Sequence, residues 1–404
     1  MNRLPRTSVH LLLKVILVLL PAAGFALGTT PVRRAKHHGA VRRKPVAAAT
    51  AHAAASLPRA TVHTASLSVP RTKVAPGPII RGGPWTEPTF ADSTMGDNVD
   101  GEDLDIRRAA VDALGAYNGS VVVVDPDNGR ILSMVNQRIA LGSGFQPCST
   151  IKVSVALAGL NEKVIAADSK YRLGGMRMDL TYALAHSNNY YFATLGQKMG
   201  FEKFSYYAHL FGYGEKAGLN IAGERAGHFP SAPPRNGGVG MLTSFGEEIQ
   251  QTPLQLAALM SAIAYGGTLY YLQYPHNQAE IAGFMPQIKR RLDIAGLIPL
   301  VKPGMRGAVE FGTAHRARED GPIAGKTGTC SENQTHLGWF GSFNDSGSRK
   351  LVVVVLLTGG RPAIGPMAAG IAGDFYKRMN DRNYFAGAAT AAPASLVATQ
   401  ICCR

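Results

Sequence analysis

The chain of 404 residues carries a serine and a lysine at a spacing that allows nucleophilic catalysis. Ser149 and Lys152 stand three positions apart, after Pro147 and Cys148, at the start of an apolar run that predicts a helix. Residues three apart share a helical face, so the lysine amine can reach the serine hydroxyl. A serine becomes a good nucleophile when a base takes its proton, and a lysine with a lowered pKa can be that base. Taken alone, the pattern also fits a capping serine followed by a solvated lysine.

Two further polar motifs follow in the chain. The first is Ser187-Asn188-Asn189, after an apolar helical segment, and the second is Lys326-Thr327-Gly328-Thr329, ahead of predicted strands. Lys326 is a candidate for the second cation that lowers the pKa of Lys152, and it would attract an anionic substrate. Gly328 lacks a Cβ and would let a substrate backbone lie close to the strand. Each motif alone also fits an ordinary turn or strand end.

Predicted strands stand at both ends of the globular sequence. Residues 120–136 form two apolar runs around the turn residues 125–129, which predicts a β-hairpin. A second such pair, 336–343 and 350–357, flanks the turn residues 344–348. The strands therefore come from segments far apart in the chain.

A helical block separates these strand groups, with helices predicted from Ser149, from Met178 and from Thr252. The last has Thr252 as N-cap, Pro253 at the first helical position, Gln255 completing a capping box, and Gly266-Gly267 at its end. A further helix is expected over 104–117. From this arrangement we expect one sheet packed against a helical subdomain, with the active site in a cleft between them.

The order and setting of the three motifs resemble those of the serine acyltransferases that include penicillin-binding proteins and β-lactamases. From about Ala116 to Met379, further segments resemble the penicillin-binding transpeptidases, among them the predicted hairpin, FGYGEKAGLNIAGERAGHFP and AGKTGT…LGWFGSF. The resemblance implies an α+β fold of the β-lactamase/transpeptidase type, a mixed sheet flanked by helices plus a helical subdomain.

The same resemblance implies a role for each motif residue. Ser149 would be the acylated nucleophile, Lys152 its proton acceptor and Ser187 the relay that returns a proton to the leaving amine. Asn189 would orient Lys152 and the substrate amide. The terminal carboxylate would be held by Lys326, Thr327 and Thr329, and the oxyanion by the N–H groups of Ser149 and Thr329. The implied reaction is D,D-transpeptidation of peptidoglycan stem peptides, with β-lactams as covalent inhibitors and without a metal or organic cofactor.

Alternatives from the same fold and from another class stay open. A β-lactamase would need a base that activates water, but the segment 215–220 is one residue longer than the E-x-x-L-N loop of class A enzymes. A D,D-carboxypeptidase may use the same motifs as a transpeptidase. A non-catalytic β-lactam sensor or wall-binding module is disfavoured because Ser149, Lys152 and Lys326 are all present. Two departures weaken the expectation of full activity: the short distance from Lys152 to Ser187, and SFGEEIQQ where the family usually has a second glycine.

The first 28 residues have the pattern of an export signal. Residues 1–28 combine early arginines with a broken apolar run, as in a signal peptide or a membrane anchor, and the sequence leaves cleavage open. We expect residues 29–90 to be a basic Ala/Pro-rich disordered linker, 91–385 to be the penicillin-binding transpeptidase domain that the resemblance implies, and 386–404 to be a flexible tail. Between residues 29 and 73 stand nine Lys/Arg and no Asp/Glu, a large share of the net charge of +15. We therefore expect the basic linker to contact a membrane surface and expect no nucleic-acid binding. The protein is expected to be exported, and to be either periplasmic or anchored to the outer face of the cytoplasmic membrane.

Cysteine is too sparse for a disulfide framework or a metal site, with four residues in the chain. Cys148 and Cys330 each adjoin a motif and could pair in an oxidising compartment. They could equally be two small buried apolar side chains.

Overall fold

The computed structural model describes residues 85–166, 168–173, 176–319 and 321–386. The predicted signal or anchor at 1–28, the linker up to residue 84 and the tail from residue 387 lie outside the described residues. Within the described ranges, every helix is too short or too polar to cross a membrane.

The central sheet has five strands in the order β2-β1-β9-β8-β7, each antiparallel to its neighbour. The α+β class is confirmed, but the mixed sheet is corrected to an antiparallel one. The reason lies in the connections: three of the four pairs join strands that are consecutive in the chain, and β9 returns beside β1 in the opposite direction. The strands are β1 (Gly119–Asp125), β2 (Arg130–Val135), β7 (Ile323–Glu332), β8 (Thr335–Asn344) and β9 (Val352–Gly359).

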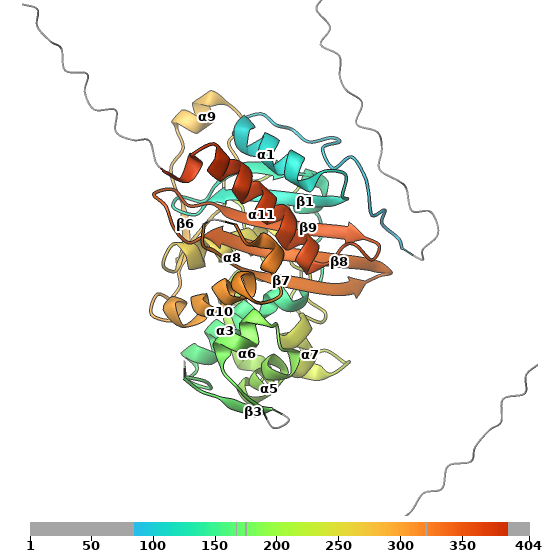
Figure 1. The fold of residues 1–404 in the computed structure, drawn as a ribbon, viewed down its shortest axis with the longest axis vertical. Coiled ribbons are helices and arrows are strands. Elements are labelled where there is room, and N and C mark those ends of the chain that lie inside the picture. Colours follow the sequence, from blue (N-terminus) through green and yellow to red (C-terminus); the bar gives the residue numbers. More distant parts are fainter. Residues whose placement is uncertain (1–84, 167, 174–175, 320, 387–404) are drawn as a thin grey trace, which may run out of the picture. The chain divides into compact units, whose positions relative to one another are not determined.

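Both faces of this sheet are buried, which explains the continuous apolar runs. In β9, Val352, Val354 and Leu356 pack into one core cluster, whereas Val353, Val355 and Leu357 pack into another. The period of two along a strand sends alternate side chains to opposite faces. Helices α1 (Leu104–Leu114) and α11 (Gly365–Asp381) cover one face, and α8 (Pro253–Ala264) contacts the sheet within the other cluster (Figure 1).

The capping prediction for α8 is confirmed. The Thr252 side chain accepts from Gln255 N, the Gln255 side chain accepts from Thr252 N, and Pro253 is the first helical residue. These bonds satisfy backbone donors that a helix start leaves free. The helix therefore begins where the sequence placed its start.

The helical part of the fold is built mainly from the middle of the chain, drawn in green and yellow in Figure 1. A short 3₁₀ turn, Cys148–Thr150, opens directly into α3, and α3 packs against α5, α6 and α7. The remaining helices and strands are α2 (Gln137–Ala140), α3 (Ile151–Asn161), β3 (Tyr171–Leu173), β4 (Met176–Met178), α4 (Leu180–Ala185), α5 (Asn189–Met199), α6 (Phe201–Leu210), α7 (Gly238–Phe245), β5 (Thr268–Tyr270), α9 (Gln278–Ala282), β6 (Ile288–Arg291) and α10 (Ile298–Glu310).

Candidate active site

The predicted nucleophile lies at the start of a buried helix. Ser149 is in the 3₁₀ turn before α3 and is 8% exposed, and Lys152 is the second residue of α3 and is fully buried. Lys152 Nζ lies 2.9 Å from Ser149 Oγ. The expectation that three-residue spacing brings amine and hydroxyl together is therefore met in the structure.

Lys152 is also the point where two of the motifs meet. Its Nζ lies 3.0 Å from Ser187 Oγ and donates to the Ser187 carbonyl at 2.8 Å and to Asn189 Oδ1 at 2.5 Å. The rings of Phe192 and Phe245 flank the amine, with centroids 5.8 and 5.9 Å away. The sequence offered no signal for these two rings, because their contact with Lys152 depends on how α5 and α7 pack.

The Ser187 hydroxyl is presented by a tight turn between α4 and α5. Ser187 has φ of 55°, a left-handed conformation that is uncommon outside glycine. Its neighbour Asn188 caps α5, since the Asn188 side chain accepts from Tyr191 N at 2.8 Å. Asn188 thus holds the start of the helix that carries Asn189. Cys148, next to Ser149, also has a positive φ of 51°. Ser187 itself, and the residue that precedes Ser149, therefore have strained backbone.

The third motif lies on β7, which is an edge strand of the sheet. Lys326 is fully buried and its Nζ donates to the Thr327 carbonyl at 3.0 Å. Within the sheet, β7 pairs with β8 on one side only, and its other side has no neighbouring strand in the described residues.

Burial shapes the charge of both lysines. Desolvation, and to a lesser degree the charge of Lys326, lowers the pKa of Lys152 to about 6. Desolvation alone lowers the pKa of Lys326 to about 7. A low-dielectric site disfavours the ammonium form, and a nearby cation disfavours it further. Near neutral pH, Lys152 is therefore largely an uncharged amine able to accept a proton.

The other residues of the third motif contact different parts of the structure. Gly328 faces the Ser149 turn: a Cβ built on it would stand 2.8 Å from the Pro147 carbonyl oxygen, closer than real Cβ contacts. A side chain at position 328 would therefore collide with the Ser149 turn, which is a structural requirement for glycine in addition to the substrate contact expected from the sequence. Thr329 Oγ1 accepts from Gly365 N at 2.8 Å, and Thr327 Oγ1 lies 2.6 Å from Thr313 Oγ1. Sequence reasoning missed Thr313, which belongs to no motif.

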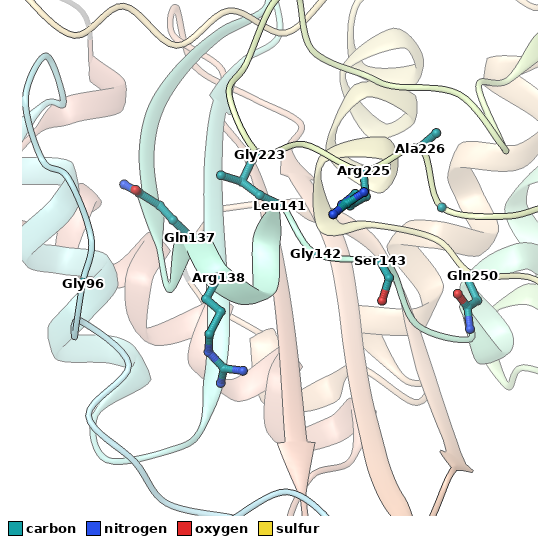
Figure 2. A pocket seen from close by; sticks show the side chains of 11 residues that line it. Gly96, Gln137, Arg138, Leu141, Gly142, Ser143, Gly223, Arg225, Ala226 and Gln250 are labelled. Carbon is teal, nitrogen blue, oxygen red and sulfur yellow. The ribbon is translucent and has the colours of Figure 1, made fainter.

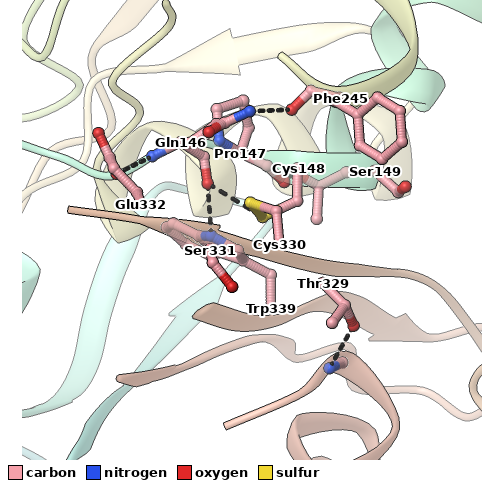
Figure 3. Close-up of a disulfide and its surroundings, with 12 residues drawn as sticks. Gln146, Pro147, Cys148, Ser149, Phe245, Thr329, Cys330, Ser331, Glu332 and Trp339 are labelled. Carbon is pink, nitrogen blue, oxygen red and sulfur yellow. Dashed lines mark hydrogen bonds between the residues drawn. A yellow bond between two sulfur atoms is a disulfide. The ribbon is translucent and has the colours of Figure 1, made fainter. Parts of the chain in front are cut away.

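A disulfide joins the first motif to the third. Cys148 and Cys330 are bonded, with Cα atoms 5.6 Å apart, and they immediately precede Ser149 and follow Thr329 (Figure 3). The sequence left this pairing open. Two backbone segments 182 residues apart are thus linked beside the nucleophile.

Gln146, which was not predicted, also holds the segment before Ser149 in place. Its N–H donates to Glu332 Oε2 at 2.9 Å, its carbonyl accepts from Trp339 Nε1 at 2.9 Å, and its amide donates to the Phe245 carbonyl at 3.1 Å (Figure 3). These bonds connect the segment before Ser149 to β7, β8 and α7.

The described part of the chain also contains a pocket away from the cluster around Lys152. An open pocket of about 790 Å³, with Arg138, Arg225 and Gln250 in its lining, contains none of the predicted site residues (Figure 2). In those same residues, no three His, Cys, Asp or Glu side chains gather in a group that could hold a metal ion.

Residues 119–377 match the model of the penicillin-binding protein transpeptidase domain. The chain belongs to this family. The match spans all five strands of the central sheet and all three motifs, so the resemblance inferred from the sequence is confirmed.

Several curated relatives are similar to this transpeptidase-family chain. Stage V sporulation protein D of Bacillus subtilis is 27% identical over 63% of this chain and 48% of its own length. The peptidoglycan D,D-transpeptidase MrdA of Escherichia coli is 25% identical over 54% of this chain and 40% of its own. FtsI of the same organism, also a peptidoglycan D,D-transpeptidase, is 26% identical over 52% and 43%. The chain therefore spans less than half the length of each of these relatives.

A solved structure supports the fold. The crystal structure of Pseudomonas aeruginosa PBP2, in complex with WCK 5153, superposes with a TM-score of 0.58 at 23% identity, covering 69% of this chain and 77% of that one. At this identity the likeness concerns the fold alone, and it agrees with the transpeptidase-like α+β architecture.

Proposed function

We propose that this chain is a serine D,D-transpeptidase that acylates Ser149 with a peptidoglycan stem peptide, releases D-Ala and transfers the acyl group to an amine of a neighbouring stem. The observation that carries the proposal is the position of Lys152 Nζ, within 3.0 Å of both Ser149 Oγ and Ser187 Oγ. One amine can thus exchange protons with two hydroxyls. The names of the relatives as D,D-transpeptidases support the same reaction.

In the acylation step, uncharged Lys152 takes the Ser149 proton as the oxygen attacks the carbonyl of the penultimate D-Ala. Its pKa of about 6 makes the amine available as a base at neutral pH. Ser187 then passes a proton to the departing amine of D-Ala. Asn189 holds Lys152 by accepting from it, which keeps the amine between the two hydroxyls.

The remaining motif residues act on charge. The backbone N–H groups of Ser149 and Thr329 are proposed to bind the oxyanion, the type of contact whose loss costs about 3–4 kcal/mol in comparable enzymes. Lys326, Thr327 and Thr329 are proposed to bind the substrate carboxylate, with the donor backbone along the free edge of β7. The disulfide and Gln146 support this geometry, because both tie the Ser149 turn to β7.

The setting of the reaction is also proposed from the sequence. We place the domain at the outer face of the cytoplasmic membrane or in the periplasm, with the basic linker near the membrane surface. Peptidoglycan stems would be its substrates and β-lactams its covalent inhibitors. The disulfide supports an oxidising compartment.

The test is intact-mass spectrometry of the full chain with and without benzylpenicillin. The unaltered chain is expected to gain the mass of one penicillin and to keep it, and Ser149→Ala is expected to gain none. Ser154→Ala is the matched control: this serine lies on α3, which directly follows the Ser149 turn, but its hydroxyl contacts Tyr213 OH at 3.1 Å instead of Lys152. A persistent adduct in Ser149→Ala would contradict the assignment of the nucleophile.

The same measurement separates the alternatives. Rapid penicillin hydrolysis without a lasting adduct would indicate a β-lactamase, and an unmodified chain without hydrolysis would indicate a non-catalytic module. Supplying an acceptor amine with a stem-peptide donor then distinguishes transpeptidation from carboxypeptidation, since only the former yields the amide product.

A further inference from the structure

An exposed row of aromatic rings lies beside the Ser187 turn. Tyr182 on α4 is 48% exposed, and Phe311 just after α10 is 53% exposed. The ring of His186 stands between them, with its centroid 4.2 Å from that of Tyr182 and 5.7 Å from that of Phe311. We call these three residues the aromatic ledge. Large rings left in water in one row, next to a reactive site, indicate a binding surface.

The ledge is fixed to the site at two points. His186 immediately precedes Ser187, whose hydroxyl lies 3.0 Å from Lys152 Nζ. On the other side, Phe311 is two residues from Thr313, whose hydroxyl lies 2.6 Å from that of Thr327. One end of the ledge thus adjoins the proposed proton relay, and the other adjoins the proposed carboxylate site.

The backbone beneath the ledge is closely packed. Thr313 N donates to the Ala185 carbonyl at 3.1 Å, and a Cβ added to Gly312 would stand 2.1 Å from the same oxygen. Gly307 on α10 also lies under the Phe311 ring, since a Cβ there would meet Phe311 at 2.7 Å. The ledge is therefore a preformed surface rather than a set of loose side chains.

We infer that the aromatic ledge is the acceptor subsite, which binds the aliphatic arm of the incoming amine. This inference rests on the proposed function. The leaving D-Ala has its carboxylate near Lys326 and Thr327 and its nitrogen near Ser187. By microscopic reversibility the acceptor nitrogen enters where that nitrogen leaves, so the rest of the acceptor lies on the same side as the ledge. Ring faces offer apolar contact to methylene groups.

In the transfer step, the acyl group moves from Ser149 to the acceptor amine. The neutral acceptor nitrogen bonds to the acyl carbon, the ester bond from that carbon to Ser149 Oγ breaks, and the proton lost by the nitrogen returns to Ser149 Oγ through Ser187 and Lys152. The ledge takes no part in the proton transfer. Its effect is to hold a long-armed amine in line with the acyl carbon, which favours aminolysis over hydrolysis.

The experiment compares two acceptors of similar basicity in the full chain. A thioester analogue of an acyl-D-alanine stem serves as donor. Nα-acetyl-lysine, with its amine on a four-carbon arm, and methylamine, without such an arm, serve as acceptors. The ratio of amide to hydrolysis product is measured for each, and the amount of benzylpenicillin adduct formed at saturation reports the folded, active fraction of each variant.

In Phe311→Ala and Tyr182→Ala, the preference for the long-armed amine over methylamine is expected to fall about three- to tenfold, the size of one lost aromatic contact. Phe311→Tyr keeps the ring and is expected to retain the preference. Tyr206→Ala, on α6, removes an even more exposed tyrosine (61%) outside the ledge and is expected to retain the preference too.

The outcomes separate the two proposals. An unchanged preference in both alanine variants, or an equal loss with both acceptors, would overturn the acceptor subsite while leaving the transpeptidase intact. An unaltered chain that fails to acylate would overturn the proposed function, and the subsite with it.

Discussion

The central strands β1 and β9 and the cluster around Ser149 are both buried, but they are built from opposite kinds of residue. From Val352 to Leu357, β9 has fully buried apolar side chains, which gain free energy by leaving water. The cluster instead buries Lys152 and Lys326, whose lowered pKa values reflect the cost of removing an ammonium group from water.

This contrast shows how the molecule divides stability from chemistry. The strands stabilise the fold, whereas the cluster uses part of that stability to hold two buried amines with lowered pKa values and left-handed backbone at Cys148 and Ser187. Substitutions in the two regions should therefore have separable effects on folding and on acylation.

The largest effect is expected from Lys152→Met. The acylation rate by benzylpenicillin should fall about 10²–10⁴-fold, the usual contribution of a general base. The free energy of unfolding should not decrease, because Met fills a similar volume without a group that must lose its proton on burial. Stopped-flow acylation and urea unfolding measure the two quantities, and a marked loss of stability would contradict the contrast drawn here.

The opposite pattern is expected from Leu356→Ala in β9. Removing this fully buried side chain should lower the free energy of unfolding by about 2–5 kcal/mol through lost burial and the cavity left behind. The acylation rate per folded molecule should stay the same under conditions where the variant is folded. A slowed acylation in the folded fraction would show that this strand and the site are coupled.

The disulfide ties the Ser149 turn to β7, the edge strand of the sheet. Replacing both Cys148 and Cys330 with alanine should lower the free energy of unfolding by about 2–4 kcal/mol. Acylation should also slow, because Cys148 and its left-handed backbone lie next to Ser149. Thermal unfolding and acylation of the reduced, unaltered chain should show the same two changes; full activity after reduction would limit the bond to a role in stability.

The smallest effect concerns pH. Lys152 has a pKa of about 6, so at lower pH its amine holds a proton and cannot accept another. The second-order acylation rate should therefore rise as the pH increases through 6. Lys326 has a pKa of about 7, so at higher pH it loses the charge that attracts the penicillin carboxylate, and the acylation rate should fall. In Lys326→Ala, the pKa of Lys152 should increase and the acid limb should move to higher pH. Lys302→Ala, which removes a lysine paired with Asp345, is the control.

The sequence alone determined the types of element and the identity of the motif residues. Apolar runs bounded by turn residues predicted β1, β2, β8 and β9, and Thr252 with Gln255 predicted the start of α8, because these signals depend on neighbouring residues only. The contact of Ser149 with Lys152 also followed from spacing, since three residues cover nearly one helical turn.

The tertiary structure decided everything that joins distant segments. The antiparallel order of the sheet, the bond from Cys148 to Cys330, the bracing by Gln146 and the contact of Thr313 with Thr327 each connect residues that lie in different elements. The low pKa of Lys152 has the same origin, because burial and the nearby charge of Lys326 exist only in the folded chain. Spacing along a helix fixes which groups can meet locally, but packing sets the dielectric and the partners that make them reactive.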